Sequence, residues 1–248
     1  MHDHAKFNEE ERYFDQVIQQ TGETWWGNRT PAGLVRLRRR ATKTLVHLGL
    51  FQDPVVLEIG CGTGLFSKLL LEGRPDLNLV SCDISKEALQ LADGNCCRFS
   101  RFKSIHRDAK NLDFSEHSFD VIIGNSILHH LCPIELILEH YYKLLKPSGL
   151  LWFSEPNMLN PHNAIEKNIR PIGRWLQATP DETAFFRWKL KRQLKTAGFQ
   201  FVEVIPYDFL YPLVPSHFIP LVDRMGQLLE RVPILREIAG SIEMIARK

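Results

Sequence analysis

The sequence predicts an α/β fold: a doubly wound, mostly parallel sheet of seven strands with helices on both faces and an antiparallel last strand. Three observations lead to this prediction. Short apolar runs alternate with helical segments between residues 54 and 155. These runs are apolar on both faces, as in a parallel sheet that is covered on two sides. A glycine-rich turn closes the first run, at the point where a doubly wound sheet binds its ligand.

The elements of this alternating region follow one another in a regular order. Strands are expected over residues 55–59, 77–82, 102–105, 119–125 and 149–154, and helices over residues 65–71, 86–92 and 134–145. Each connection between parallel strands must be a right-handed crossover. The helices are therefore expected on both faces of the sheet.

The residues before the sheet are predicted to be helical. Apolar side chains recur at helical spacing from residue 8, and a turn-like stretch from Gly22 to Gly33 separates them from a second helix over residues 34–48. This second helix is basic. Its four arginines are interpreted as a solvated face, and they are Arg36, Arg38, Arg39 and Arg40.

The tail of the chain adds the remaining strands. A helix over residues 183–197 is expected to end at Gly198, because glycine is the favoured residue just after a helix. Strands are expected over residues 199–205 and 241–247. Two insertions, residues 156–182 and 206–239, separate these elements from the sheet and from each other.

The composition excludes several classes of protein. The 248 residues include 31 Lys+Arg and 29 Asp+Glu, a net charge of +2, which excludes a protein that coats nucleic acid by bulk electrostatics. No apolar run is long enough to cross a bilayer, and the polar first residues are unlike a secretory signal. The five cysteines form no metal-binding spacing, which predicts buried, reduced thiols, no metal site and a cytoplasmic protein.

The glycine-rich turn is the most informative segment. It reads Glu58-Ile-Gly60-Cys-Gly62-Thr-Gly64 between the first strand and the first helix. A dinucleotide-binding turn of the form G-x-G-x-x-G would place its third glycine at position 65, which is Leu65. An acid two residues before the first glycine would also serve a pyrophosphate poorly. It is better suited to a ligand with an amino group.

These residues resemble motif I of the class I S-adenosylmethionine-dependent methyltransferases. The resemblance covers about residues 54–155 and continues, in order, through Asp83, Asp108, Asn125 and Lys146-Pro147-x-Gly149. It implies a Rossmann-like fold. It also implies S-adenosylmethionine as cofactor, with S-adenosylhomocysteine as product.

The resemblance assigns a role to several of these positions. Asp83 follows the second strand and lies about 20 residues after Gly64, which is where this fold places a ribose-binding carboxylate. Its alternative role is to cap the helix that begins at Lys86. Asp108 is implied to accept a bond from the adenine amino group, and Asn125 to lie beside the methionine part. The implied cofactor-binding residues are Glu58, Gly60, Cys61, Gly62, Thr63, Gly64, Asp83, Ile84, Asp108, Ala109, Asn125 and Ser126.

Methyl transfer needs a general base only when the acceptor must first lose a proton. An imidazole titrates near neutral pH, and His129 and His130 follow the fourth strand, beside the expected methyl site. They are the candidates for such a base, with His130 slightly ahead. The alternative is that one of them packs and the other caps or binds a cofactor group, so the catalytic residue is left open.

Four further residues are predicted on the substrate side. Glu155 and Asn157 follow the fifth strand at the edge where ligands bind, although Glu155 could equally bond a nearby backbone turn. Trp26 and Arg29 belong to an aromatic, turn-rich segment that we expect to fold over the cofactor site as a lid. In this hypothesis Arg29 lies near a carboxylate.

The insertion over residues 206–239 is rich in apolar side chains at helical spacing. Packing on the core or a homodimer contact is one interpretation. An apolar wall for a hydrophobic acceptor is the other. The whole chain is predicted as one domain, with residues 1–50 as an N-terminal cap, residues 54–155 as the cofactor-binding core, and the two insertions forming the substrate side.

The predicted function is methyl transfer from S-adenosylmethionine to a small-molecule or lipid-like acceptor. After the fourth strand the chain reads Asn125-Ser-Ile-Leu rather than the Asn/Asp-Pro-Pro-aromatic motif of enzymes that methylate nucleobase amines, so a nucleic-acid acceptor is disfavoured. Two alternatives stay open. One is an RNA or protein methyltransferase that docks through residues 36–43, and the other is a non-catalytic protein that keeps the fold and binds the cofactor.

Overall fold

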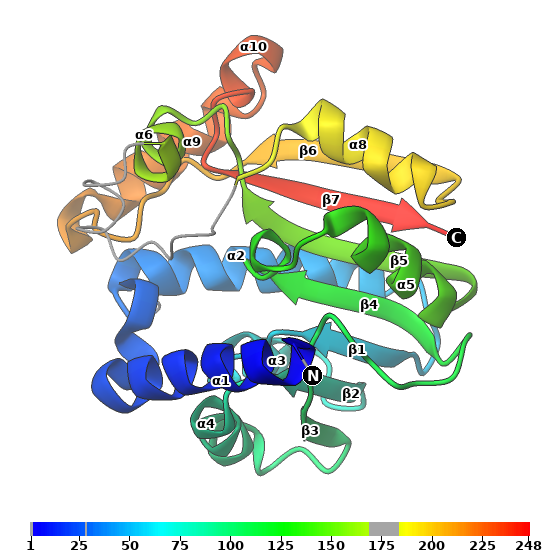
Figure 1. Ribbon diagram of the computed structural model, residues 1–248. Helices are drawn as coiled ribbons and strands as arrows, with labels where there is room; N and C mark the ends of the chain where they lie inside the picture. Colours follow the sequence, from blue (N-terminus) through cyan, green and yellow to red (C-terminus); the bar gives the residue numbers. More distant parts are fainter. Residues whose placement is uncertain (1, 28, 169–183) are drawn as a thin grey trace.

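The protein is built around one seven-stranded sheet with the strand order β3-β2-β1-β4-β5-β7-β6 (Figure 1). The computed structural model describes residues 2–27, 29–168 and 184–248, without the side chains of residues 2–8, 25 and 26. The strands are β1 (Val55–Ile59), β2 (Asn78–Asp83), β3 (Phe102–His106), β4 (Phe119–Asn125), β5 (Leu145–Pro156), β6 (Phe201–Tyr207) and β7 (Ser241–Arg247).

The directions of the strands agree with the predicted class. β1 lies at the centre of the parallel part, where Leu57 pairs with Val80 of β2 and with Ile122 of β4. β7 is antiparallel to both of its neighbours, β5 and β6. Successive strands are added on one side of β1 as far as β3 and on its other side from β4 onward. The carboxyl ends of β1 and β4 therefore border the crevice in which such sheets bind ligands. The prediction of a doubly wound, mostly parallel sheet with an antiparallel last strand is confirmed.

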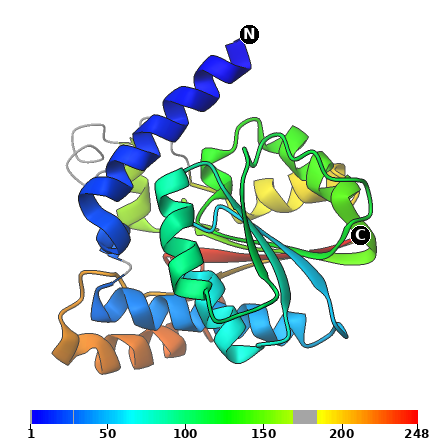
Figure 2. The ribbon, with the colours of Figure 1, turned by 90° about the horizontal axis from the view of Figure 1, so that it is seen from below.

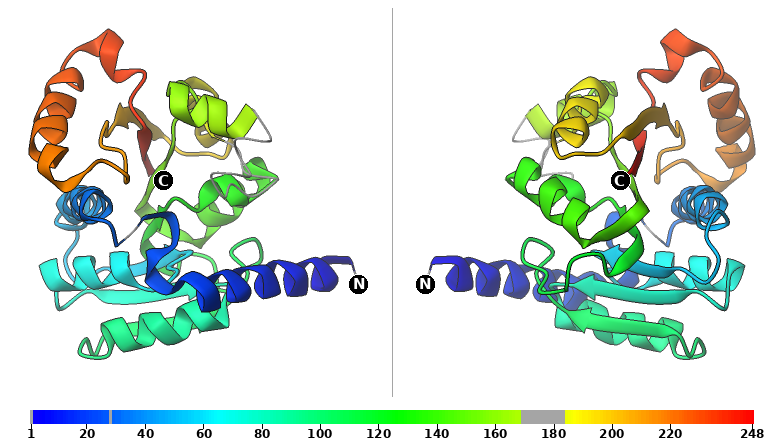
Figure 3. Two further views of the ribbon diagram at one scale, coloured as in Figure 1. Left: turned by 90° about the vertical axis from the view of Figure 1, so that its left-hand side faces the viewer. Right: turned by 90° about the vertical axis from the view of Figure 1, so that its right-hand side faces the viewer.

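Helices cover both faces of the sheet because successive strand residues point to opposite sides. In β1, Val56 packs with α2 (Pro31–Leu48) and α3 (Leu65–Gly73) on one face. The next residue, Leu57, packs with α5 (Ile134–Leu144) and α8 (Arg187–Thr196) on the other. Figure 3 shows these two helical layers on opposite sides of the strands. Both faces are thus buried, which explains why the strands read as continuous apolar runs.

The N-terminal segment forms a helical arm that reaches across the sheet edge. It consists of α1 (His2–Thr21), the short 3-10 helix η1 (Gly22–Gly27) and α2. α1 lies against α4 (Lys86–Cys96), where Asp15 accepts a bond from Ser85 Oγ at 2.6 Å and Glu11 pairs with Lys86 at 2.7 Å. Its N-terminal end extends beyond the body of the molecule (Figure 2).

The two insertions supply further helices at the same end of the sheet. α6 (Pro161–Asn168) follows β5, and the rest of that insertion from residue 169 lies outside the described residues. The second insertion contains η3 (Ser216–Phe218), α9 (Ile219–Leu229) and α10 (Pro233–Arg236). The 3-10 helix η2 (Leu128–His130) follows β4. α8 ends as expected before Gly198, which adopts the left-handed φ of +107°.

The interpretation of the α2 arginines as a solvated face is wrong for three of the four. Arg36 donates to Asp208 at 2.7 Å, Arg39 pairs with Glu230, and Arg40 donates to Asn125 at 2.7 Å. Only Arg38 of the four is exposed. The reason is that the insertion before β7 packs on α2 and covers this side of the helix, through a cluster that includes Ala32, Leu210 and Ile219.

The prediction of buried cysteines holds for three of the five. Cys61, Cys82 and Cys96 are buried, whereas Cys97 and Cys132 are exposed, and all five are free thiols. Within the described residues, no helix is both long and apolar enough to cross a membrane.

Candidate active site

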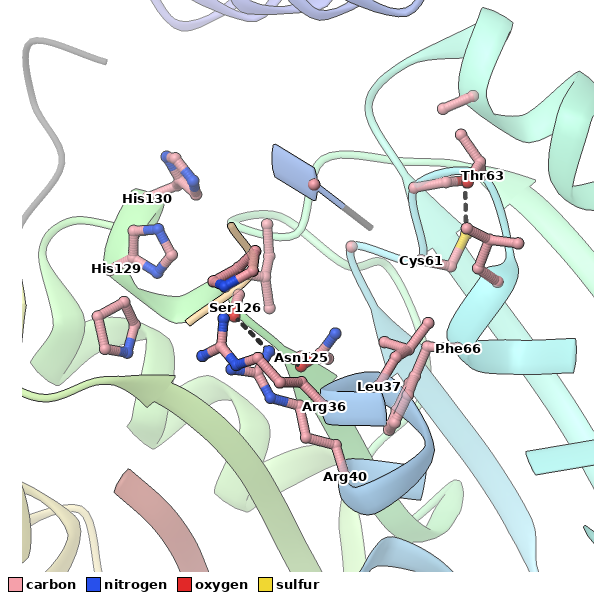
Figure 4. A pocket seen from close by; sticks show the side chains of 18 of the residues that line it. Arg36, Leu37, Arg40, Cys61, Thr63, Phe66, Asn125, Ser126, His129 and His130 are labelled. Carbon is pink, nitrogen blue, oxygen red and sulfur yellow. Dashed lines mark hydrogen bonds between the residues drawn. The ribbon is translucent and has the colours of Figure 1, made fainter. Parts of the chain in front are cut away.

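A cavity of about 920 Å³ lies at the carboxyl edge of the parallel strands. Its wall is formed by α1 and η1, the glycine turn after β1, the ends of β2 and β4, α6 and residues 208–213. Figure 4 shows the glycine turn on one side and the two histidines on the other, with Arg36 and Arg40 between them. The sheet, the N-terminal arm and both insertions therefore meet at one pocket.

The glycine turn has the backbone that its sequence predicts. Gly60 and Gly62 adopt left-handed φ values of +64° and +53°. A Cβ atom at Gly60 would lie 2.4 Å from the side chain of Ile127, so the close approach of these two segments requires glycine. A Cβ atom at Gly62 would meet no protein atom within 4 Å. That position opens into the cavity, which leaves room for a ligand against the backbone.

Glu58 lies beneath this turn. Its carboxylate is almost fully buried, and Oε2 accepts bonds from Ser67 Oγ and Ser81 Oγ, both at 2.6 Å. Burial raises the pKa of Glu58 to about 7, although the two hydroxyl bonds oppose this shift. The carboxylate thus ties α3 and β2 to the turn, and it belongs to the cavity wall.

Asp83 holds the glycine turn from the end of β2. Its Oδ2 accepts the backbone N–H of Gly62 at 2.7 Å, and its Oδ1 accepts that of Ser85 at 2.9 Å. The cap of α4 is Ser85, whose Oγ accepts the N–H of Ala88, so the alternative role of Asp83 as helix cap is excluded. Burial raises the pKa of Asp83, and this effect is larger than the opposing effect of the backbone hydrogen bonds. An ionised carboxylate with two bonds made keeps acceptor capacity for hydroxyl donors.

The remaining implied cofactor residues also lie along the cavity, except Gly64, which packs against Ala92 of α4 and is absent from the described wall. Asp108 follows β3 and accepts the backbone N–H of Lys110 at 2.8 Å. Ala109 beside it is 9% exposed, and its carbonyl accepts a bond from Tyr141. The other implied residues on the wall are Cys61, Thr63, Ile84, Asn125 and Ser126. Burial raises the pKa of the Cys61 thiol, so this side chain acts as a small apolar group.

Arg40 is a wall residue that sequence reasoning missed. Its Nη1 donates to Asn125 Oδ1 at 2.7 Å and to Ser126 Oγ at 3.1 Å, and its Nη2 donates to Ser241 Oγ at 3.0 Å. Its Nε is buried and has no hydrogen-bond partner among the described residues. Burial and the nearby Arg36 lower the pKa of Arg40. A signal was present in the sequence, because Arg40 continues the buried stripe of Gly33, Leu37 and Thr44 at helical spacing.

Glu155 and His129 form a buried pair next to the pocket. Glu155 Oε2 lies 2.7 Å from His129 Nδ1, and Oε1 accepts the backbone N–H groups of Ile127 and Leu128 at 3.0 and 2.8 Å. Glu155 is 0% exposed, so the expectation of a direct substrate contact is wrong and its alternative, a bond to the nearby turn, is correct. β5 runs to Pro156, two residues further than predicted, and this keeps Glu155 inside the sheet.

The two candidate histidines lie differently. Both belong to the pocket wall, and their rings are 4.1 Å apart between centroids. His129 is buried and bonded to Glu155. His130 is half-buried and packs edge-on against Phe14 of α1, 6.0 Å between ring centroids. The geometry therefore favours His129 over His130 as a base, the reverse of the expected order.

Two substrate-side expectations change, and a third falls on a side chain outside the described residues. Asn157 is 1% exposed, and its amide donates to the carbonyls of Glu237 and Ala239, so it joins the two insertions instead of contacting a substrate. Arg29 pairs with Glu23 and is absent from the described wall of the pocket. The side chain of Trp26 lies outside the described residues. Among the described residues, no group of three or more His, Cys, Asp or Glu could hold a metal ion.

The pocket wall combines acidic groups with a guanidinium. The open Cβ position of Gly62 and the carboxylates of Asp83 and Asp108 belong to this wall. The buried carboxylate of Glu58 and the partly unsatisfied guanidinium of Arg40 add groups of opposite charge. These groups suit S-adenosylmethionine, which carries a ribose, an amino group and a carboxylate.

Comparison with known proteins agrees with this class. Residues 57–151 match a family model described as a methyltransferase domain. This part of the chain is therefore similar in sequence to a methyltransferase domain, and solved S-adenosylmethionine-dependent methyltransferases share its fold. The resemblance found in its motifs is thereby confirmed for this part of the chain, and it supports the predicted enzyme class and cofactor.

Three similar proteins illustrate the breadth of this class. The chain is 28% identical over 137 residues to a malonyl-[acyl-carrier protein] O-methyltransferase of Priestia megaterium, covering 54% of this chain and 49% of that one. It is 27% identical over 175 residues to a trans-aconitate 2-methyltransferase of Methylobacterium radiotolerans, covering 70% and 62%. The chain thus spans about half to three fifths of these relatives. The N-methyltransferase NodS from Bradyrhizobium japonicum, solved with S-adenosylhomocysteine, shares the fold with a TM-score of 0.61 at 18% identity, covering 95% and 98%.

Proposed function

We propose that this enzyme methylates a small-molecule or lipid-like acceptor that must lose a proton, with His129 as the base. The Glu155–His129 pair carries the proposal. Because Glu155 Oε1 already accepts two backbone N–H groups, its carboxylate is held as an acceptor and His129 Nδ1 is the donor between them. The lone pair of the imidazole is then on Nε2, on a ring that belongs to the pocket wall.

The chemistry divides between cofactor and protein. S-adenosylmethionine supplies a methyl group that is already activated by a sulfonium, so the bond from sulfur to methyl breaks as the bond to the acceptor forms. His129 takes the acceptor's proton on Nε2, and Glu155 stabilises the imidazolium that results. The enclosing arm of α1 and η1 excludes water from the pocket that it lines.

Arg40 is the proposed partner of the cofactor's carboxylate. The resemblance places the methionine part beside Asn125 and Ser126, and Arg40 donates to both side chains. In this proposal the cation that pairs with a carboxylate is therefore Arg40 of α2, where the sequence had suggested Arg29. Glu58 is the proposed partner of the amino group, while Asp83 and Asp108 remain the proposed partners of ribose and adenine.

The acceptor side of the pocket is built by the two insertions. His162 and Asn163 of α6 and Phe209, Leu210 and Tyr211 of the second insertion line it. This mixture of aromatic, aliphatic and amide groups suits an acceptor with an apolar body. The names of two relatives give malonyl-[acyl-carrier protein] and trans-aconitate as acceptors, which supports a small-molecule acceptor without identifying it.

The alternative of an RNA methyltransferase is weakened because residues 36–43 do not form a free basic patch. Within residues 36–43, Arg36, Arg39 and Lys43 form ion pairs with Asp208, Glu230 and Glu243. Their charges are neutralised inside the molecule, so they offer little attraction to phosphates. The lid role of residues 1–50, the substrate role of the insertions and a cytoplasmic location remain part of the proposal.

The function is tested by supplying S-adenosylmethionine with a labelled methyl group to the enzyme together with fractionated host metabolites, lipids, RNA and protein. We expect label in a small-molecule or lipid fraction, and loss of that label with His129→Ala. Label in RNA or protein would replace the proposed acceptor class. Cofactor binding without transfer to any fraction would favour a non-catalytic role.

A further inference from the structure

An apolar surface that lies almost entirely outside the active site is found on the insertion before β7. In a helix of this kind we expect one apolar face, packed on the protein. α9 has two, and the outer one is exposed: Leu221, Met225 and Leu228 are 57%, 53% and 54% exposed. We call the following exposed side chains the α9–α10 patch: Leu213, Phe218, Leu221, Met225, Leu228, Val232, Ile234, Leu235 and Ile238.

The inner face of α9 accounts for its position in the fold. Ile219 is buried in a cluster with Ala32 of α2 and Leu210, and Gly226 packs closely against Phe209. The helix is therefore held in place without any contribution from its outer face. Apolar patches of this extent on a folded chain mark contact with another surface.

The charges around the patch are basic. Arg224 lies three residues after Leu221 and four before Leu228, so it borders the apolar stripe, and Arg231 follows the end of the helix. Both arginines are exposed. The nearby acids are engaged elsewhere, since Glu230 pairs with Arg39 and Glu237 pairs with Arg187. Asp223 on the same helix accepts a bond from Gln227.

A basic helix begins next to the residues that follow α10. The Arg187–Glu237 pair, 2.7 Å between Nε and Oε2, joins the start of α8 to the residues after α10. Figures 1 and 3 show both helices at the same end of the molecule. α8 contains no acidic residue and exposes Trp188, stacked on Phe186 with 5.3 Å between ring centroids. The exposed basic residues of α8 are Lys189, Lys191, Arg192 and Lys195.

We propose that the α9–α10 patch docks the protein on a bilayer that carries anionic headgroups. An apolar stripe bordered by arginines is the pattern of a helix that lies in the membrane interface. A bilayer supplies the negative charge that the patch lacks. A second copy would bring two further exposed arginines to the contact, whereas a bilayer brings negative headgroups.

The patch also reaches the active site. Leu213 is 67% exposed and lines the cavity, so the insertion that carries the patch also contributes an exposed apolar side chain to the pocket wall. A docked enzyme would thus open its acceptor side toward the lipid. This step rests on the proposed function and identifies the acceptor as one that resides in the membrane, whereas the docking itself does not depend on the reaction.

The test is co-sedimentation of the full-length protein with phosphatidylcholine vesicles, with and without phosphatidylglycerol. We expect binding to the anionic vesicles that weakens as salt is added. The triple substitution Leu221→Ser, Met225→Ser and Leu228→Ser should weaken it on the order of tenfold or more, because these side chains would leave the acyl boundary. Val46→Ser with Leu136→Ser is the matched control, since these apolar residues of α2 and α5 are also more than 60% exposed.

Arg224→Glu tests the charge, with Lys103→Glu on the distant edge strand β3 as its control. We expect weaker binding to anionic vesicles from the first change only. Failure to bind either vesicle would overturn the proposal, and so would anionic binding that the triple substitution leaves unchanged. A dimer in analytical ultracentrifugation that the triple substitution dissociates would assign the patch to a second copy instead.

Calorimetry with S-adenosylhomocysteine separates this proposal from the proposed function. The triple variant should bind the product as the wild type does, since its three positions are absent from the described pocket wall. If the protein binds vesicles but transfers no methyl group, the docking proposal stands and the proposed function is wrong. If it transfers a methyl group but binds no vesicles, the proposed function stands and the docking proposal is wrong.

Discussion

Glu155 Oε2 lies 2.7 Å from His129 Nδ1, and both side chains are buried at the edge of the cofactor pocket. The same carboxylate accepts two backbone N–H groups of the turn between β4 and η2. It therefore orients the imidazole and fixes the loop that carries it. This one contact links the fifth strand to the proposed base.

Replacing this carboxylate tests its role as a positioning group. Glu155→Gln keeps an oxygen for the backbone N–H groups but presents an NH2 group to His129 Nδ1, which disfavours the productive tautomer. We expect kcat to fall roughly 10²- to 10⁴-fold, as for loss of a general base. Affinity for S-adenosylhomocysteine should stay within about twofold by calorimetry. Glu139→Gln, an exposed acid on α5, is the control, and equal loss in both variants would contradict the assignment.

Asp83→Ala should weaken cofactor binding more than any other single change in the turn. The substitution removes the proposed ribose contact and also the bond from the N–H of Gly62. Charge-assisted hydrogen bonds are worth about 1.5–3 kcal/mol, so the Kd for S-adenosylhomocysteine should rise roughly 10- to 100-fold. Asp93→Ala on the exposed side of α4 is the control. Unchanged affinity in Asp83→Ala would remove the ribose assignment.

Arg40 should distinguish cofactors by their carboxylate. We expect the wild type to bind S-adenosylmethionine at least about tenfold more tightly than its decarboxylated analogue, because a guanidinium pairs strongly with a carboxylate. Arg40→Leu should remove this preference by weakening the affinity for S-adenosylmethionine alone. Arg38→Leu, the exposed arginine of the same helix, should leave the preference intact. An unaltered preference in Arg40→Leu would assign the carboxylate to another residue.

Glu58 predicts a pH dependence of cofactor binding. Its pKa of about 7 means that the free protein carries a neutral Glu58 side chain below neutral pH. A bound amino cation favours the ionised form, so a proton must leave on binding below pH 7. Affinity for S-adenosylhomocysteine should therefore rise with pH, by up to about tenfold per unit, and level off above 7. Calorimetry at several pH values measures this dependence. In Glu58→Gln the affinity should change with pH only through titration of the ligand, without the additional rise below pH 7.

Glu243 predicts a loss of stability in acid. Burial raises the pKa of Glu243, but bonds from His47, Lys43 and Trp152 outweigh it and lower the value to about 2, from an ordinary 4.5. The stabilisation is fully present above pH 4.5 and is lost as the pH falls toward 2. It amounts to about 3 kcal/mol in the free energy of unfolding.

Urea unfolding at pH 7 and pH 3 measures this term. Glu243→Gln should lower stability at pH 7 and show a smaller further decrease in acid than the wild type. Glu203→Gln on the exposed face of β6 is the control. If the free energy of unfolding falls between pH 7 and pH 3 by the same amount in both variants and in the wild type, groups other than Glu243 cause the loss.

Much of the cofactor side was predictable because its signals are local in the chain. Successive residues such as Val56 and Leu57 alternate between the two helical layers, which the apolar runs on both faces of the sheet indicated. Glycines at 60 and 62 reveal left-handed backbone directly, because few other residues adopt it. Asp83 lies at a strand end whose position follows from the length of the preceding helix and strand.

The substrate side was harder because its contacts join distant parts of the chain. Arg40 meets Asn125, 85 residues away, only because α2 packs along the sheet. Asn157 donates to the carbonyl of Ala239, 82 residues away. A residue that its position after a strand had placed on the substrate side therefore holds two insertions together. The predicted strand stopped at residue 154, whereas pairing of Glu155 with Ile242 of β7 extends β5 and buries that carboxylate.

By itself, the sequence determined the parallel sheet, the glycine turn and the acids around it, and the resemblance that these residues carry predicted S-adenosylmethionine as the cofactor. These features depend on side-chain period and backbone conformation, which a few neighbouring residues specify. The tertiary structure decided which of two histidines meets a carboxylate, which arginine faces the pocket, and which apolar helix face stays exposed. Those outcomes depend on how insertions and helices pack against one another, because the same side chain is solvated, paired or buried according to what lies opposite it.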